Sequence, residues 1–144
     1  MIGKVISLNI SEQTSVIKEP VEQALFIDDY GIKGDGHAGS GHRQISLLGI
    51  ESYNRLEQKG KKFLPGAFAE NITTEGFVLN ELTVGTVFKI GETVQEITEI
   101  GKKGHDKFEI IKLFGAYILP VEGIFTKVIK GGIVRVGDTI EIVG

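Results

Sequence analysis

Two short segments in the second half of the chain combine a Val-Gly turn with a strand that alternates apolar and polar residues. They are Val84–Ile90 and Val136–Ile142. In the first segment, the period of two places Phe88 and Ile90 on one face. Glycine is more frequent than usual, with 20 of 144 residues, whereas the chain has 3 prolines and no tryptophan. Short strands joined at glycine corners are typical of a β-barrel, so the sequence predicts a mostly β fold with a closed barrel.

The other elements are predicted from local periodicity and from turn signals. A helix is predicted over residues 50–59, because apolar residues fall near helical spacing and Lys59-Gly60 is a C-terminal stop signal. Pro65-Gly66 predicts a turn before a short strand that begins near Asn71. Short helical turns are expected near residues 105–114. Further strands are predicted at residues 5–10, 24–27, 44–48 and 94–100, and residues 11–20 are expected to form a loop.

Composition excludes several classes of protein. The absence of cysteine excludes disulfides, zinc–thiolate sites and thiol nucleophiles. The N-terminal residues show no signal-peptide pattern, and no apolar run approaches the roughly 18 residues that span a bilayer. We therefore expect a soluble, cytoplasmic protein with a single domain over residues 1–144 and no membrane partner. The net charge of −3 argues against a nucleic-acid partner. The oligomeric state is left open.

A glycine-rich polar loop precedes the apolar strand at residues 44–48. It has five glycines between Gly31 and Gly41, and it holds two of the three histidines, His37 and His42. A polar glycine loop that ends on an apolar strand is a common arrangement for a functional loop on a rigid scaffold. A long turn with solvated charges has the same composition, so both interpretations stay open. The charged residues of the loop are Lys33, Asp35 and Arg43.

The third histidine, His105, lies in a second glycine-rich loop over residues 101–108. All histidines of the chain therefore fall in two polar loops. Basic residues outnumber acidic residues only in the part of the chain from 101 to 144, and a local basic rim can attract a small anion. We expect the loops 33–44 and 101–108 to face one another across one concave pocket.

Five motifs occur in one order along nearly the whole chain. They are Gly-Asp-Gly-His-Ala-Gly with His-Arg-Gln-Ile-Ser-Leu-Leu, Pro-Gly-Ala-Phe-Ala-Glu-Asn-Ile, Gly-Lys-Lys-Gly-His, Leu-Pro-Val-Glu-Gly-Ile-Phe, and Gly-Asp-Thr-Ile. Together they resemble the MOSC domain, which is named for the C-terminal domain of molybdenum cofactor sulfurases, and especially its short stand-alone bacterial members. The resemblance implies a closed barrel, similar to the β-barrel of pyruvate kinase, with one or a few short helices.

The same resemblance implies binding of the molybdenum cofactor (molybdopterin) or a related anionic ligand, in cofactor maturation or sulfur handling. It also associates the chain with molybdenum-ion and pyridoxal-phosphate binding, and with molybdenum-cofactor biosynthesis proteins as partners. The family's usual sulfur carrier is a cysteine, and the close bacterial relatives have the pattern Gly-Lys-x-Cys-His-x-x-Cys. Here Gly104 and Phe108 occupy the two cysteine positions. Persulfide transfer by this chain is therefore not expected.

The candidate ligand-binding residues supply cationic, imidazole and amide groups, which suit an anionic ligand. Arg43 offers a bidentate grip on a phosphate. Asp35 and Glu70 are candidates to orient the histidines, or they pair with loop lysines to hold the fold. Asn71 is either a ligand donor or a turn residue. No catalytic residue is assigned. The full set of cofactor-binding candidates is Lys33, Asp35, His37, His42, Arg43, Asn71, Lys102, His105 and Arg135.

Two other classes of function stay open at this point. One is a metal-dependent hydrolase that uses Asp35, His37, His42 and His105. Its two loop histidines, in the pattern His-x4-His, lack the helical i, i+4 spacing of known zinc motifs, so no metal ligand is assigned. The other is a non-catalytic partner or scaffold module of a molybdenum-cofactor assembly enzyme, which the missing cysteine favours.

Overall fold

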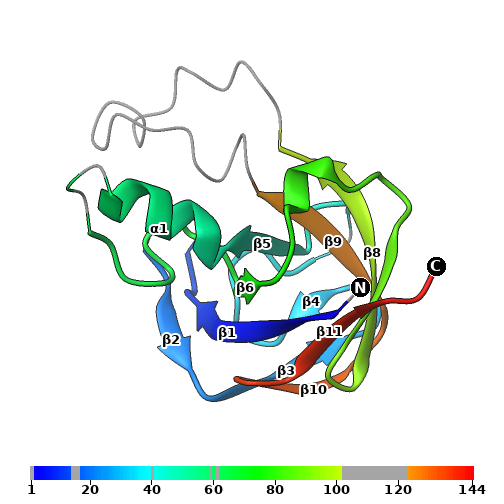
Figure 1. The fold of residues 1–144 in the computed structure, drawn as a ribbon. Helices are drawn as coiled ribbons and strands as arrows, with labels where there is room; N and C mark the ends of the chain where they lie inside the picture. Colours follow the sequence, from blue (N-terminus) through cyan, green and yellow to red (C-terminus); the bar gives the residue numbers. More distant parts are fainter. Residues whose placement is uncertain (1, 14–16, 40, 59, 61, 102–122) are drawn as a thin grey trace.

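The computed structural model describes residues 2–13, 17–39, 41–58, 60, 62–101 and 123–144. Strands predominate in these ranges, and seven of the described strands close into a barrel (Figure 1). This confirms the predicted mostly β fold and closed barrel. In spatial order the barrel strands are β11 (Thr139–Ile142), β7 (Val87–Ile90), β8 (Thr93–Ile100), β9 (Ile124–Lys130), β5 (Ile45–Gly49), β6 (Ile72–Glu75) and β1 (Ile2–Ile10), and β1 pairs with β11 to close the ring.

The two similar Val-Gly segments become neighbours in the barrel. β7 and β11 pair in antiparallel orientation, with Ile140 opposite Ile90 and Ile142 opposite Phe88. Both strands turn the same kind of residue inward, because Phe88, Ile90 and Ile140 are fully buried. The alternation that predicted two strands therefore also describes one continuous part of the barrel wall.

A smaller sheet and two short helices complete the described fold. β2 (Glu19–Val21) extends the barrel sheet beside β1, so the expected loop 11–20 is wrong at its end, where the strand begins. The helix predicted over 50–59 is confirmed as α1 (Ile50–Gln58), and η1 (Leu79–Glu81) is a single 3-10 turn. The expected helical turns near 105–114 lie outside the described residues. The second sheet has the order β10 (Gly132–Arg135), β3 (Gln23–Ile27) and β4 (Gly31–Ile32).

The core fills the barrel and the space beneath α1. Inside the barrel, aliphatic and aromatic side chains from every barrel strand are buried in one cluster, which includes Val5, Ile72, Phe88 and Ile97. β5 is buried along its whole length because its outer face is covered as well. There Leu48 packs with Tyr53 and Phe68 in a second cluster, to which α1 contributes Tyr53. α1 lies beside β5 (Figure 1). The outer faces of β5 and β6 are thus also buried inside the protein.

Two register shifts decide which polar side chains lie on the outer face of the barrel. In β8 the pairing with β9 shifts between Ile97 and Glu99, so that Glu99 lies opposite Phe125. Without the shift, Glu99 would share the inward face of Ile97, two residues earlier. A comparable shift in β1 between Val5 and Ser7 places Ser7 opposite Thr73 of β6. β-bulges of this kind re-aim side chains, and here they bring polar groups outside the barrel.

Candidate functional site

Asp35 is the centre of a buried charge cluster at the start of the glycine loop. Its Oδ1 accepts hydrogen bonds from Lys18 Nζ at 2.8 Å and from the backbone N–H of Ser11 at 3.1 Å. Its Oδ2 accepts one from the backbone N–H of His37 at 3.0 Å. The side chains of Lys18 and Asp35 have no exposed surface at all. The carboxylate therefore ties the segment before β2 and the end of β1 to the glycine loop.

The close fit of the loop requires glycine at Gly36. Its N–H donates to the carbonyl of Ser11 at 2.7 Å, and a Cβ at this position would lie 2.7 Å from the carbonyl oxygen of Glu12. Burial by itself raises the pKa of Asp35. Hydrogen bonds from Lys18 and the Ser11 N–H, the charge of Lys18 and the His37 N–H outweigh it, so the pKa lies below the ordinary value. Asp35 is thus an ionised anchor of the loop.

His37 lies beside this anchor with one ring nitrogen in the interior. Its Nδ1 is buried, lies 3.8 Å from Asp35 Oδ2, and has no hydrogen-bond partner among the described residues. Burial lowers the pKa of His37, and the charges of Lys18 and Arg43 lower it further, against the opposing charge of Asp35. His37 is therefore a neutral imidazole at pH 7, within the electrostatic influence of Lys18 and Arg43.

Arg43 forms a second charge cluster on the outer wall of β8 and β9. Its Nε and Nη2 donate to the two oxygens of Glu99, at 2.8 and 2.6 Å, and its guanidinium lies 4.9 Å from the centre of the Phe125 ring. The pKa of Arg43 is raised, chiefly by its hydrogen bonds to Glu99. His42 Nε2 is 3.1 Å from the same carboxylate. The Arg43 side chain is 44% exposed, so this cation is fixed in direction and open to solvent.

Glu70 is buried without a cation beside it among the described residues. Its Oε2 accepts hydrogen bonds from Tyr53 Oη at 2.6 Å, Thr73 Oγ1 at 2.8 Å and the N–H of Gly66 at 3.2 Å. Its Oε1 is buried and has no partner in the described part of the chain. Burial raises the pKa of Glu70, and the hydrogen bonds from Tyr53 and Thr73 only partly offset that effect. The preceding residue, Ala69, has φ of 68°, a conformation rare for a residue with a side chain.

Asn71 connects three strands from the position just before β6. Its Oδ1 accepts from the N–H of Ser46 at 3.0 Å, and its Nδ2 donates to the carbonyl of Asn9 at 3.2 Å. The side chain is fully buried. In this structure Asn71 thus holds β5 and β1 to the segment that enters β6. Asn9 continues the network by donating to Thr73 Oγ1 at 3.2 Å.

The structure brings some of the predicted site residues together and separates others. Asp35 and His37 are in contact, Arg43 is close enough to affect the pKa of His37, and His42 shares Glu99 with Arg43. Lys33 is exposed. Arg135 lies apart, on β10, where its Nη1 is 3.7 Å from Glu92 Oε2. Lys102, His105, Gly104 and Phe108, and with them the predicted pocket between the two loops, lie outside the described residues.

Sequence reasoning missed three residues that organise these clusters: Lys18, Tyr53 and Glu99. Lys18 lies in a polar stretch with no apolar periodicity, and Tyr53 is one of the residues at helical spacing in the predicted helix over 50–59. Glu99 gave one available signal, because it is a carboxylate at an alternating position of a predicted strand. Among the described residues, no group of three or more histidine and acidic side chains is placed to hold a metal ion.

A barrel with a charged glycine loop against its outer wall defines a class of domain, and comparison with known proteins gives that class a name. The family model for the MOSC domain matches residues 34–141, and this chain belongs to the MOSC domain family. Sequence relatives are the uncharacterized protein YflK of Bacillus subtilis, 24% identical over 143 residues, and protein YiiM of Escherichia coli, 23% identical over 106 residues. These alignments cover 90% and 67% of this chain, and 63% and 47% of the relatives, so the chain spans less than two thirds of their length.

Solved structures share the whole fold. The YuaD protein of Bacillus subtilis superposes with a TM-score of 0.76 at 25% identity, over 99% of this chain and 96% of that one. YiiM of Geobacillus stearothermophilus superposes with a TM-score of 0.72 at 18% identity, over 99% of this chain and 75% of the other. Within the described residues no helix has the length and apolar character needed to span a membrane.

Proposed function

We propose that this MOSC domain binds the molybdenum cofactor (molybdopterin) or a related anionic ligand, and serves in cofactor maturation or sulfur handling without carrying sulfur itself. Membership of the MOSC domain family, which is associated with the molybdenum cofactor, supports this ligand class. The observation that carries the proposal for this chain is Arg43, a half-exposed guanidinium that Glu99 and Phe125 hold in place close to His37. The ligand's phosphate and its oxo-metal centre are both anionic, so the cationic surroundings fit it.

The charges around the glycine loop form two ion pairs, of which Lys18–Asp35 is fully buried and Arg43–Glu99 leaves its cation partly exposed. Lys18 and Asp35 are fully buried and neutralise each other, so they hold the loop and do not contact a ligand. Arg43 binds Glu99 through Nε and Nη2 only, and no described residue accepts a hydrogen bond from Nη1. A guanidinium that is already oriented loses less entropy when it binds an oxyanion. The exposed His42 and Lys33 are further candidates to contact such a ligand.

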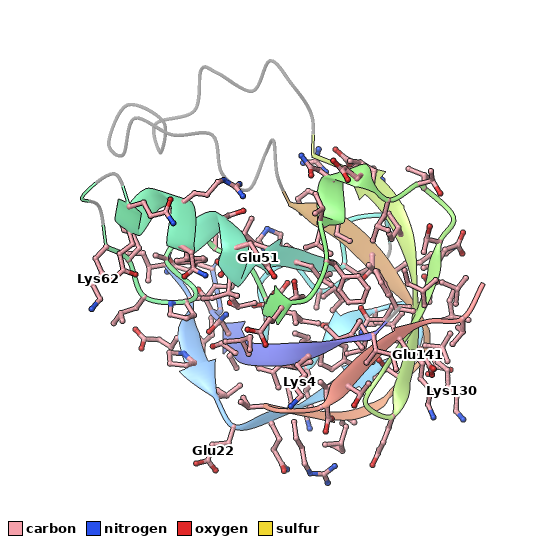
Figure 2. The ribbon with its side chains drawn as sticks, in the orientation of Figure 1. Lys4, Glu22, Glu51, Lys62, Lys130 and Glu141 are labelled. Atoms are coloured by element: carbon pink, nitrogen blue, oxygen red, sulfur yellow. The ribbon has the colours of Figure 1, made fainter. Side chains whose placement is uncertain are left out.

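Arg43→Ala should weaken binding of purified molybdopterin by about 1.5–3 kcal/mol, because a charge-assisted hydrogen bond is lost. Arg43→Lys should weaken binding less, since it keeps the charge and loses the fork geometry. The measurement is a calorimetric or fluorescence titration. Lys130→Ala is the matched control, since this exposed lysine lies on the side of the barrel away from α1 and Lys62 (Figure 2). Equal loss of affinity in the Arg43 and Lys130 variants would rule out a specific role for Arg43.

The wild-type protein should accept no sulfur from a cysteine desulfurase. A persulfide carrier needs a thiolate, and the chain has no cysteine. The measurement is intact mass after incubation with a desulfurase and isotopically labelled cysteine. Label on the wild-type protein that a thiol reductant removes would contradict the prediction. Gly104→Cys and Phe108→Cys, at the two carrier positions of the family pattern, are the comparison variants that regain a thiol.

A scaffold role is the second candidate, and the missing cysteine favours it. In that case the domain would associate with a molybdenum-cofactor biosynthesis protein and would not bind the cofactor itself. The titration with purified molybdopterin separates the two roles, because a scaffold gives no saturable signal. Metal analysis of the purified protein tests the hydrolase alternative, for which the described residues offer no cluster of ligands.

A further inference from the structure

His37 has one ring nitrogen in the interior, and part of its side chain is exposed at the glycine loop. Nδ1 is buried, whereas 21% of the side chain is exposed. Nε2, unlike Nδ1, is not among the buried side-chain nitrogens without a partner in the described residues. A ligand that approaches the loop from solvent meets this nitrogen.

The position of Asp35 determines which ring nitrogen of His37 carries the hydrogen. Nδ1 lies 3.8 Å from the negatively charged Oδ2, too far for a hydrogen bond but close enough for charge to select the tautomer. A hydrogen on Nδ1 is attracted by this oxygen, whereas a lone pair is repelled. The neutral ring therefore carries its hydrogen on Nδ1 and directs a lone pair outward from Nε2.

The other charged groups around His37 keep the ring neutral. Lys18 comes from the segment before β2 and Arg43 from the segment before β5, and both are cations. Asp35, on the same loop, is the opposing anion, and Lys18 neutralises it at 2.8 Å. Glu99 pairs with Arg43 at 2.6 Å and orients its guanidinium. The site thus combines an oriented guanidinium with an acceptor that cannot bond a fully deprotonated oxygen.

We propose that His37 Nε2 is a hydrogen-bond acceptor that makes this site select an oxyanion still carrying a proton, such as hydrogen phosphate, over a fully ionised one such as sulfate. This deepens the proposed function, on which it rests, by naming the ionic form of the group that is bound. The proton of the ligand lies between its oxygen and Nε2, and Arg43 supplies the opposite charge. Sulfate places only lone pairs against Nε2, so the two acceptors repel one another.

The experiment compares inorganic phosphate with sulfate at pH 8 and constant ionic strength. Phosphate is then chiefly the dianion HPO4²⁻, which equals sulfate in charge and shape and differs from it by one proton. NMR titration measures weak affinities, and the nitrogen shifts of the His37 ring report directly which nitrogen carries the hydrogen. We expect phosphate to bind at least about tenfold tighter than sulfate, a modest share of the discrimination that a hydrogen-bonding site gives. We also expect the ring hydrogen of His37 to be on Nδ1.

Three variants separate selectivity from folding. His37→Phe keeps a planar ring without an acceptor and should bind both anions with similar affinity, whereas His37→Gln keeps an acceptor and should retain part of the preference. Lys130→Ala is the control at an exposed position outside the site and should keep the full preference. Thermal unfolding verifies that each variant is folded.

The possible failures are distinguishable. Equal binding of phosphate and sulfate by the wild-type protein would overturn the selectivity and leave the anion site standing. A preference that survives in His37→Phe, or a ring hydrogen on Nε2, would also overturn it. If neither anion binds while molybdopterin does, the selectivity is wrong and the proposed function is kept. If molybdopterin does not bind either, both proposals fail.

Discussion

Lys18→Met should lower the free energy of unfolding by about 3–5 kcal/mol at pH 7, the usual cost of removing one partner from a buried ion pair. The methionine replaces most of the apolar volume of the lysine, so the loss reports on charge and hydrogen bonding more than on packing. Asp35 would remain in an interior site with no exposed surface and without its cation. The backbone N–H groups of Ser11 and His37 would still reach it, but neither carries a full charge. Urea unfolding measures the effect.

Two further variants test whether the loss of stability in Lys18→Met is caused by the unpaired charge of Asp35. In Lys18→Met with Asp35→Asn, the unpaired charge is removed, and the amide oxygen keeps the hydrogen bond from either Ser11 or His37, which donate to different oxygens of Asp35. Part of the lost stability should therefore return. Lys127→Met is the exposed control, because its partner Glu96 is 3.8 Å away and both side chains are partly solvated. It should cost less than about 1 kcal/mol. A Lys18→Met variant as mild as Lys127→Met would show that the buried pair does not hold the loop.

The difference in stability between the wild type and Lys18→Met should depend on pH, and the pKa of Asp35 gives the direction. Asp35 has a lowered pKa in the folded protein, so its contribution to stability is present above the ordinary value of 3.8 and is lost as the pH falls through the folded-state value. In Lys18→Met, burial remains without the cation, and the pKa of Asp35 should rise. Protonation then relieves the unpaired charge. The gap between wild type and variant should therefore narrow as the pH is lowered from 7 toward 4.

The fold could be predicted from this sequence wherever one face of a strand is buried. β7 and β11 show the alternation clearly, and α1 is bounded by a recognisable stop signal. β4, with two residues, is too short for a period of two to be visible. β5 is buried on both faces and reads as a continuous apolar run instead of an alternating one. The second sheet depends on pairings across more than one hundred residues, such as Ile133 with Leu25, which no local pattern contains.

The site was predictable in its glycine loop but not in the residues that fix it. Asp35, His37 and Arg43 stand out because they are polar residues among closely spaced glycines. Their partners do not, since Glu99 reaches the outer wall only through the shift in register after Ile97. Tertiary geometry of this kind has no signature in the local sequence. The position of Glu99 near the end of a predicted strand can suggest a β-bulge, but it does not identify Arg43 as the partner of the carboxylate.

Asp35 and Glu70 are two buried carboxyl groups whose pKa values are shifted in opposite directions by their surroundings. Both are removed from solvent, which raises the pKa of each. Asp35 has the ammonium group of Lys18 in contact, and its pKa falls below the ordinary value. Glu70 receives only neutral donors from the described residues, and its pKa stays raised. One group is therefore a permanent charge, and the other is a carboxyl that binds its proton more tightly in the folded protein.

Glu70→Ala should lower the free energy of unfolding by at least about 3 kcal/mol, because three buried donors lose their acceptor, each at a cost of roughly 1–3 kcal/mol. The donors are Tyr53 Oη, Thr73 Oγ1 and the Gly66 N–H, which all converge on Oε2. Tyr53 remains a donor throughout, since burial, followed by the charge of Glu70, raises its pKa. Urea unfolding is again the measurement. Glu75→Ala, at an exposed position at the end of β6, is the control and should change stability by less than about 0.5 kcal/mol.

Glu70→Gln should be much milder than Glu70→Ala, and its effect should depend on pH in the direction opposite to that of Lys18→Met. The glutamine oxygen can accept the same three hydrogen bonds, and the amide is never charged. In the wild type, the raised pKa of Glu70 contributes stability that is full below the ordinary value of 4.5 and is lost as the pH rises through the folded-state value. The variant has no such loss, so its stability relative to wild type should improve between pH 4.5 and pH 8. An unchanged difference across this range would show that Glu70 does not retain its proton. A Glu70→Ala variant as stable as Glu75→Ala would show that the buried network contributes nothing.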